Sequence, residues 1–348
     1  ARPAAAGEDP AFVKGLDECF ENIAGQADQG GSLFTHRQVN FGPMYASKLR
    51  SGIKPAVRKL HREIKALDEV LDLAHPRAIV TPVGRRSLHA LGELANQRGI
   101  PGLLISHGSF TPLKNELEEM AWKFHAHGLF HGSYSHAALQ TPLAESFSNE
   151  VTSTAQYVKT GPLSWGIHCP RDAAQALKVQ MLGADQDCRV VVHAGTGKAR
   201  GSMHFHVYET LDEYVAAMGE LVLAVDQVPD TFLILKFRPN ANLGMEDLRT
   251  LLPASDRYMI SVNESFLDVL GFTDLLVSFS STTIEEALQN RVPVLLYGGD
   301  GRYQHIASQD ISPEVGAEAG ALYSVRKTEH LAGGLKKILD CNGHAPLP

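Results

Sequence analysis

The stretch that decides the fold runs from Thr273 to Tyr303 and reads TDLLVSFSSTTIEEALQNRVPVLLYGGDGRY. Its apolar segment Leu275–Ser278 predicts a buried strand, and the apolar segment Pro293–Tyr297 predicts a second one. A hydroxyl-rich turn lies between them and leads into a helix that carries two glutamates. This order of strand, turn, helix and strand is typical of a parallel α/β sheet.

The hydroxyl-rich turn is the candidate ligand site. It consists of Ser280, Ser281, Thr282 and Thr283. The turn would lie at a helix N-terminus and at the carboxyl end of a strand, two places where anions and ligands bind in such folds. A capping box, formed by Thr282 with Glu285 or by Thr283 with Glu286, is the alternative that needs no ligand. Because four hydroxyls exceed what a cap requires, we predict a phosphate site at this turn. Glu286, on the helix that follows, is predicted to belong to the same donor-binding site.

The length of the chain predicts two domains. Its 348 residues exceed the usual size of a single domain, and two domains of about 150 residues each are the default expectation. A turn-rich linker at Thr160–Ala173 places the domains at residues 1–165 and 174–348. Hydrophobic residues make up 44% of the chain, which allows each domain a buried core.

Charge and cysteine use limit the environment and the partners. The formal net charge of −7 argues against a general nucleic-acid or anionic-membrane surface, although a local basic patch is still able to bind phosphate groups. The four cysteines are widely separated and form no CxxC pair, which favours reduced thiols. No apolar run reaches membrane-spanning length, and no signal peptide opens the chain. We expect a cytoplasmic protein without an integral membrane segment, either free or peripheral at the inner membrane.

The N-terminal half begins with helices. The spacing of apolar residues predicts a helix from Ala11 and a second, long helix that begins near Lys54 and ends before His75. No strand is predicted before Ala78, and the chain does not begin with Met. The sequence is therefore expected to be either one module of a larger polypeptide or a domain with an unusual helical start.

Alternating strands and helices follow and set the fold class. In the N-terminal half we expect strands at Ala78–Pro82, Gly102–Ser106 and around Leu129, with a helix at Arg86–Arg98. In the C-terminal half we expect strands at Arg189–His193, Phe232–Lys236 and Tyr258–Ile260, with helices at Leu211–Val225 and Thr328–Leu339. This pattern predicts the α/β class: two Rossmann-like domains that face each other across a cleft.

Three motifs in this order resemble a known family. His107-Gly108, continuing to Thr111-Pro112-Leu113-Lys114, is similar to the HGTPLK segment of CDP-glycerol enzymes. Lys236-Phe237-Arg238-Pro239 is similar to their K-x-HP motif, with Arg238 in place of the histidine, and Ser280–Thr283 is similar to their phosphate-holding turn. From about Lys54 to Leu339 the chain resembles GT-B glycosyltransferases of bacterial surface polysaccharides, which include Kdo transferases, sialyltransferases and CDP-glycerol transferases.

Cations and amides near the predicted turn suit a leaving phosphate. Glycosyl transfer without a metal requires hydroxyls, helix N-termini and cations to stabilise the charge that builds on the phosphate. Lys236 and Arg238 follow a predicted strand and supply such cations. The glycine loop after the strand at Arg189–His193 adds Gly195 and Lys198, although an ordinary tight turn explains that loop equally well.

The acceptor hydroxyl requires a general base. His107 has a suitable intrinsic pKa; the alternative is a loop histidine that hydrogen-bonds to the backbone. Glu116 and Glu119 lie one helical turn apart and are secondary candidates for a base or a nucleophile, and a solvated helix face is the alternative for each.

A metal site is not expected. Four histidines cluster in the N-terminal half, at His125, His127, His131 and His136, but no cysteine or close carboxylate completes a ligand set. The resemblance to GT-B enzymes also implies donor binding without a metal. We therefore predict no metal and no cofactor.

The leading functional hypothesis is transfer of a sugar, such as Kdo or a related ulosonic acid, from a CMP-linked or other nucleotide-activated donor. The acceptor would be an oligosaccharide or glycolipid of a growing bacterial surface glycan, such as lipopolysaccharide or capsule. Three alternatives stay open: glycerophosphate transfer from CDP-glycerol, a nucleotide-sugar 2-epimerase of the same fold, and a sugar-binding module without catalytic activity.

Overall fold

The structure is a computed structural model of the chain. It describes residues 9–30, 32–106, 114–120, 128–130, 132–148, 153–163, 165–167, 170–183, 187–195, 209–239, 243–302, 304 and 306–342. Two compact units make up the chain. The first contains Ala1–Ile105, His127–Ala138 and Thr152–Val158, and the second contains Ser106–Ala126, Leu139–Val151 and Lys159–Pro348. The division at residues 1–165 and 174–348 stays a prediction.

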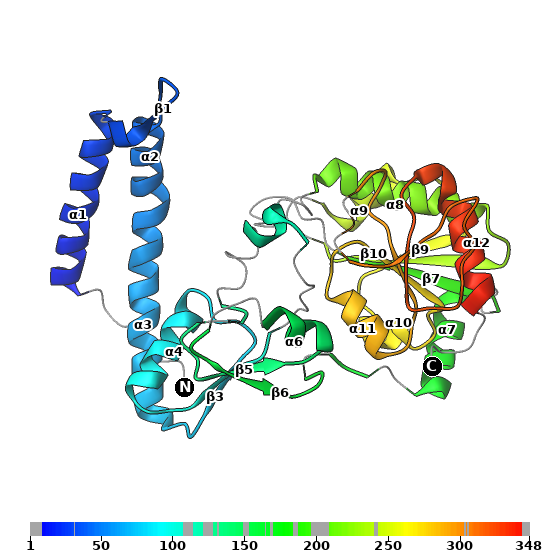
Figure 1. Cartoon of the computed structure of the whole chain (residues 1–348), viewed down its shortest axis with the longest axis horizontal. Coiled ribbons are helices and arrows are strands. Elements are labelled where there is room, and N and C mark those ends of the chain that lie inside the picture. The colour runs from blue at the N-terminus through cyan, green and yellow to red at the C-terminus, as the bar shows by residue number, and fades with distance from the viewer. Residues whose placement is uncertain are drawn as a thin grey trace. The chain divides into compact units, whose positions relative to one another are not determined.

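The first unit begins with a helical hairpin (Figure 1). Its elements are α1 (Pro10–Asp28), η1 (Ser32–Phe34), β1 (Thr35–His36), β2 (Val39–Asn40), α2 (Gly42–Lys48), the π-helix η2 (Leu49–Ile53) and α3 (Lys54–Ala74). Asp9 caps α1, since its Oδ1 accepts hydrogen bonds from Ala11 N at 3.0 Å and Phe12 N at 3.4 Å. Both long helices agree with the sequence-based prediction.

Small residues let α1 and α2 approach closely. Ala24, Ala27 and Ala46 are fully buried between these helices. A Cβ atom added at Gly42 would lie 1.9 Å from the carbonyl oxygen of Ala27, so only glycine fits there. An ion pair joins α1 to α3, since Arg58 Nη2 lies 2.5 Å from Asp17 Oδ1.

A four-stranded sheet completes the N-terminal half. Its strand order is β3-β4-β5-β6, with β3 at Ile79–Thr81, β4 at Gly102–Leu104, β5 at His136–Leu139 and β6 at Gln156–Lys159. The described pairings of β3 with β4 and of β4 with β5 are parallel. The helices α4 (Ser87–Gln97) and α6 (Pro142–Ser148) accompany it.

The strand expected around Leu129 was wrong. Residues 128–130 form a turn, and the third strand of this sheet begins at His136. Gly128 has φ +77°, and its carbonyl oxygen accepts a hydrogen bond of 2.7 Å from Gly84 N. Leu129 and Phe130 are buried although they lie in a turn, and this burial explains why their apolar character suggested a strand.

The second unit contains a seven-stranded sheet in the order β12-β13-β11-β10-β7-β8-β9, and all its pairings are parallel. Its strands are β7 (Arg189–Ala194), β8 (Thr231–Lys236), β9 (Tyr258–Ser261), β10 (Leu275–Ser278), β11 (Val294–Leu296), β12 (Gln309–Asp310) and β13 (Leu322–Ser324). Its helices are α7 (Arg171–Leu182), α8 (Leu211–Asp226), α9 (Met245–Leu251), α10 (Phe266–Leu270), α11 (Thr283–Gln289), η5 (Thr328–His330) and α12 (Leu331–Asn342).

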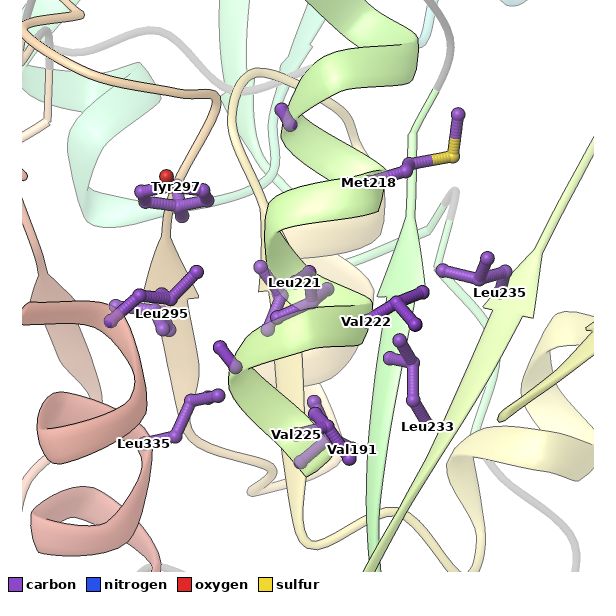
Figure 2. Packing of buried hydrophobic residues seen from close by; sticks show 14 of the residues in the cluster. Val191, Met218, Leu221, Val222, Val225, Leu233, Leu235, Leu295, Tyr297 and Leu335 are labelled. Atoms are coloured by element: carbon purple, nitrogen blue, oxygen red, sulfur yellow. The ribbon is translucent and has the colours of Figure 1, made fainter. Parts of the chain in front are cut away.

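Helices cover both faces of this sheet, and each face has its own apolar core. Figure 2 shows the first core, in which Leu221, Val222 and Val225 of α8 lie over Val191 of β7 and Leu233 of β8. Because these strands are buried on both faces, they consist of nearly continuous apolar residues. The prediction of the α/β class with parallel sheets is confirmed. Within the described part of the chain, no helix is long and apolar enough to span a membrane.

Candidate active site

The strand order of the second unit creates a switch point between β7 and β10. From β7 the chain adds β8 and then β9 on one side, and it then returns to place β10 on the other side of β7. Ligands of open parallel sheets bind in the crevice at the carboxyl ends of the strands at such a point. His193 and Val277 are register partners at these strand ends.

Thr283 joins the two strand ends. Its Oγ1 donates a hydrogen bond of 3.2 Å to the carbonyl oxygen of Ala194, which ends β7, and lies 3.3 Å from Ser278 Oγ, which ends β10. The side chain of Thr282, the N-cap residue of α11, makes no capping hydrogen bond. The capping-box alternative was therefore wrong, because tertiary contacts take the Thr283 hydroxyl that local capping would use.

A pocket lies at this switch point. It has an empty volume of about 340 Å³, open solvent included. Its lining residues come from the ends of β7, β10 and β11 and from α8 and the residue segment before it: His193, Gly195, Glu209, Tyr214, Ala217, Phe279, Ser280, Ser281, Tyr297 and Gly298. Three of the predicted site residues, Gly195, Ser280 and Ser281, thus line a single pocket.

His193 is an uncharged group in this pocket at neutral pH. Burial lowers the pKa of its imidazole from 6.5 to about 4. Its ring centroid lies 6.0 Å from that of Tyr214, whose hydroxyl donates a hydrogen bond of 3.1 Å to the carbonyl oxygen of Gly195. Burial, and then the Glu209 carboxylate, raises the pKa of Tyr214. Sequence reasoning missed His193 as a site residue, although a histidine near the carboxyl end of a buried parallel strand could have indicated a ligand site.

Close packing of Phe279 on Gly298 shapes another wall. A Cβ atom at position 298 would lie 2.7 Å from Phe279 Cγ, so the position requires glycine. Arg302 lies over the Phe279 ring, with its guanidinium carbon 4.8 Å from the centre of that ring. Arg302 Nη1 also lies 3.6 Å from Glu213 Oε1. This cation was not predicted, since its position depends on a ring that is distant in sequence.

Tyr297 is held by a chain of polar contacts. Its hydroxyl donates to Glu220 Oε2 at 2.7 Å and lies 2.9 Å from Thr328 Oγ1. Thr328 Oγ1 donates in turn to Asp300 Oδ1 at 2.8 Å. Burial raises the pKa of Tyr297, so its hydroxyl stays protonated and presents a fixed ring to the pocket.

The predicted cations Lys236 and Arg238 lie at the end of β8 and do not line the pocket. Lys236 Nζ donates a hydrogen bond of 3.0 Å to the carbonyl oxygen of Val262. Burial lowers the pKa of Lys236, against the opposing effect of Glu264. Arg238 is exposed. Their role in phosphate binding stays a prediction.

The predicted carboxylates lie in different environments, and their catalytic roles stay predictions. Glu116 and Glu119 are exposed, whereas Glu118 is buried, and its Oε2 accepts a hydrogen bond of 2.8 Å from Lys114 N. Glu286 on α11 is half-buried, and burial, followed by repulsion from Glu285, raises its pKa. The predicted residues His107 and Lys198 lie outside the described residues.

No group of three or more potential metal ligands occurs in the part of the chain that the structure describes. Of the four clustered histidines, His136 is described; its Nδ1 lies 2.9 Å from Ser135 Oγ. His125, His127 and His131 lie outside the described residues.

Comparisons with solved structures support this architecture. The chain is similar to the UDP-GlcNAc 2-epimerase of Neisseria meningitidis solved with UDP-GlcNAc, with 15% identity, a TM-score of 0.55 and coverage of 84% of this chain and 77% of that one. A Listeria monocytogenes protein assigned as a UDP-N-acetylglucosamine 2-epimerase shares 16% identity at a TM-score of 0.54, with coverage of 83% and 72%. Another UDP-N-acetylglucosamine 2-epimerase shares 13% identity at a TM-score of 0.51, with coverage of 83% and 70%.

No family model matches the chain, and no curated protein matches it. At these identities the likeness shows the fold. The chain has the GT-B-like fold of these epimerases, with two Rossmann-like domains, and this part of the sequence-based prediction is confirmed. The cleft between the domains stays a prediction.

Proposed function

We propose that this chain is a nucleotide-sugar 2-epimerase that binds its substrate in the pocket between the ends of β7 and β10. The observation that carries the proposal is the coincidence of this pocket with the switch point of a fold similar to UDP-GlcNAc 2-epimerases. A uridine-linked amino sugar is therefore the first substrate to test. It replaces the CMP-linked Kdo donor of the leading sequence-based hypothesis, since no comparison supports a Kdo transferase or a sialyltransferase.

The polar groups of the pocket suit a sugar nucleotide. The hydroxyls of Ser280 and Ser281 are able to donate hydrogen bonds to phosphate oxygens. The guanidinium of Arg302 lies 4.8 Å from the centre of the Phe279 ring, and the carboxylate of Glu213 partly offsets its positive charge. The aromatic rings of Phe279 and Tyr297 offer apolar surface to a base or sugar.

His193 is the proposed acid–base group. A 2-epimerase changes the configuration at C2 of the sugar, so a bond at that carbon breaks and re-forms, and such chemistry needs a group that accepts and returns protons. The neutral imidazole is able to accept a proton. A bound phosphate would raise its pKa towards neutrality, since a nearby negative charge favours the charged form. The N-terminal candidates His107, Glu116 and Glu119 remain proposals for the same task.

Incubation of the protein with UDP-GlcNAc in the absence of any acceptor tests the proposal. Proton NMR of the sugar should show a second anomeric signal, from the C2 epimer, and its intensity should grow until equilibrium. GDP-, CMP- and CDP-linked donors in parallel incubations show which base is accepted. If no donor gives an epimer, and none of the nucleotides binds in calorimetry, the proposal is wrong.

Two sets of variants connect the activity to the pocket. The double variant Ser280→Ala/Ser281→Ala should weaken nucleotide binding, and His193→Asn should reduce turnover more than binding. Ser312→Ala is a matched control, because this exposed hydroxyl donates to Glu314 Oε2 outside the pocket. Equal activity in all variants would contradict the assignment of the site.

Glycosyl transfer to a surface glycan is the second candidate. Lys236 and Arg238 support it, because Lys236 ends β8 and Arg238 follows it in a K-x-R-P motif that resembles the donor-binding motif of polysaccharide transferases. For a transferase, nucleotide would be released from the donor on addition of an oligosaccharide or glycolipid acceptor, and no epimer would form without it. The same incubations therefore separate the two reactions.

A further inference from the structure

The far end of the helical hairpin has an unusual surface. This end, the hairpin tip, comprises residues 32–48, from η1 through β1 and β2 to α2 (Figure 1). It carries five large apolar side chains that are exposed to solvent: Leu33, Val39, Phe41, Met44 and Tyr45. Leu33 is 89% exposed and Met44 is 60% exposed. Such a group of apolar residues on a projecting element marks an interaction surface.

The charge of the tip is entirely positive. Residues 29–62 contain no aspartate or glutamate. Further along the hairpin, Arg50, Lys54 and Arg58 are neutralised by acidic residues of α1. Arg37 and Lys48 at the tip are exposed and have no acidic partner among the described residues. The tip is thus cationic in a chain whose net charge is −7.

The turn between β1 and β2 places Arg37 in an unusual backbone conformation. Thr35 pairs with Asn40 and His36 with Val39, so the loop consists of Arg37 and Gln38 alone. Their φ angles are +46° and +68°, the combination that a type I′ turn requires and that asparagine and glycine adopt most readily. Two larger residues in this conformation cost free energy, and strain of this kind is typical of functional sites.

We propose that the hairpin tip docks on an anionic lipid surface. Its apolar side chains would enter the headgroup boundary while Arg37 and Lys48 contact lipid phosphates, as amphipathic interfacial segments do. Tyr45 and Phe41 are residue types suited to that boundary. The single sign of the charge argues against a second copy at this surface, because a symmetric contact would bring the two Arg37 guanidinium groups together. The α3 helix is about 32 Å long at 1.5 Å per residue, and this length separates the tip from the other end of α3.

Vesicle sedimentation with the full chain tests this proposal. The protein should sediment with vesicles of phosphatidylcholine that contain phosphatidylglycerol, and it should stay in solution with phosphatidylcholine alone. Each cation lost should weaken binding about fivefold, so Arg37→Gln/Lys48→Gln should bind about 25-fold more weakly. Met44→Ser should weaken binding about tenfold, and raised salt should release the protein.

Matched controls lie at the opposite end of α3. Leu73→Ser removes an exposed apolar side chain and Arg77→Gln an exposed cation, and both variants should bind vesicles as the native chain does. Circular dichroism checks that each variant folds. The proposal is overturned if the chain does not bind anionic vesicles, or if tip and control variants bind equally. It is also overturned if analytical ultracentrifugation without lipid shows a dimer that the tip variants abolish, since the tip would then contact a second copy.

Discussion

Replacement of Gly298 by alanine tests the shape of the pocket directly. The new Cβ atom would lie 2.7 Å from Phe279 Cγ and 2.9 Å from Phe279 Cβ, whereas carbon atoms in contact are normally about 3.5–4.0 Å apart. Phe279 cannot easily move away, because it is buried and Arg302 lies over its ring. Overpacking of this kind costs about 1–3 kcal/mol.

The thermal midpoint measures this cost. For a unit of this size, each kcal/mol lowers the midpoint by about 2–4 °C, so Gly298→Ala should melt about 2–12 °C below the native chain. Displacement of the Phe279 ring into the pocket should also weaken UDP binding about tenfold, equivalent to about 1.4 kcal/mol. Differential scanning calorimetry and titration calorimetry give the two values.

Gly195→Ala is the stability control for this experiment. Gly195 lines the same pocket, but a Cβ atom there would lie 3.9 Å from Ser278 Oγ, the nearest atom among the described residues, which is an ordinary contact. Its thermal midpoint should equal or slightly exceed that of the native chain, since alanine restricts the unfolded state. If Gly298→Ala melts at the native temperature and binds UDP normally, the packing of Phe279 against Gly298 is not a feature of the folded protein.

Three further predictions concern stability. The pKa of His193 in the folded protein is about 4, below its ordinary value of 6.5, so the unfolded state binds more protons between these two pH values. The free energy of unfolding should therefore fall by about 3 kcal/mol as the pH falls from 6.5 to 4. Urea titrations of His193→Asn should lack this pH-dependent component. Thr283→Val removes the hydroxyl that donates to Ala194 and should lower the free energy of unfolding by about 1–2 kcal/mol, whereas Thr283→Ser should not. Gly42→Ala places a Cβ atom 1.9 Å from the Ala27 carbonyl oxygen and should lower the free energy of unfolding by about 3 kcal/mol. Amide hydrogen exchange should show faster opening of α1. An unchanged exchange rate would contradict the close approach of α1 and α2.

Five of the seven strands in the sheet of the second unit could be predicted from the sequence, whereas the short strands β12 and β13 were not predicted. The limits of β10 were predicted without error, because a strand buried on both faces is a continuous apolar run between polar residues. Leu129 shows the limit of this reasoning, since it is buried although it lies in a turn, where Gly84 N donates a hydrogen bond to the carbonyl oxygen of Gly128. The β1–β2 hairpin was not predicted, because Arg37 and Gln38 carry no turn signal.

The site was predicted only in part, because its residues are distant in the sequence and only the tertiary structure brings them together. Ser280 and Ser281 could be found from a local pattern at the end of a strand. Thr283 has the sequence pattern of a capping residue, but its hydroxyl donates a hydrogen bond to the carbonyl oxygen of Ala194, which is distant in the sequence. Arg302 acquires its position from the ring of Phe279, and no spacing rule in the sequence relates these two residues.

The adjacency of β7 and β10 has a consequence for synthesis of the protein. These strands are joined where Asp274 Oδ2 accepts a hydrogen bond of 2.7 Å from Val190 N, across 84 residues of chain. A nascent polypeptide that has emerged only as far as β9 contains three adjacent strands but lacks half of the pocket wall. A sugar nucleotide that binds this pocket, as proposed, would therefore not stabilise early translation intermediates. Its stabilising effect would begin once the ribosome has released the segment that contains β10 and β11.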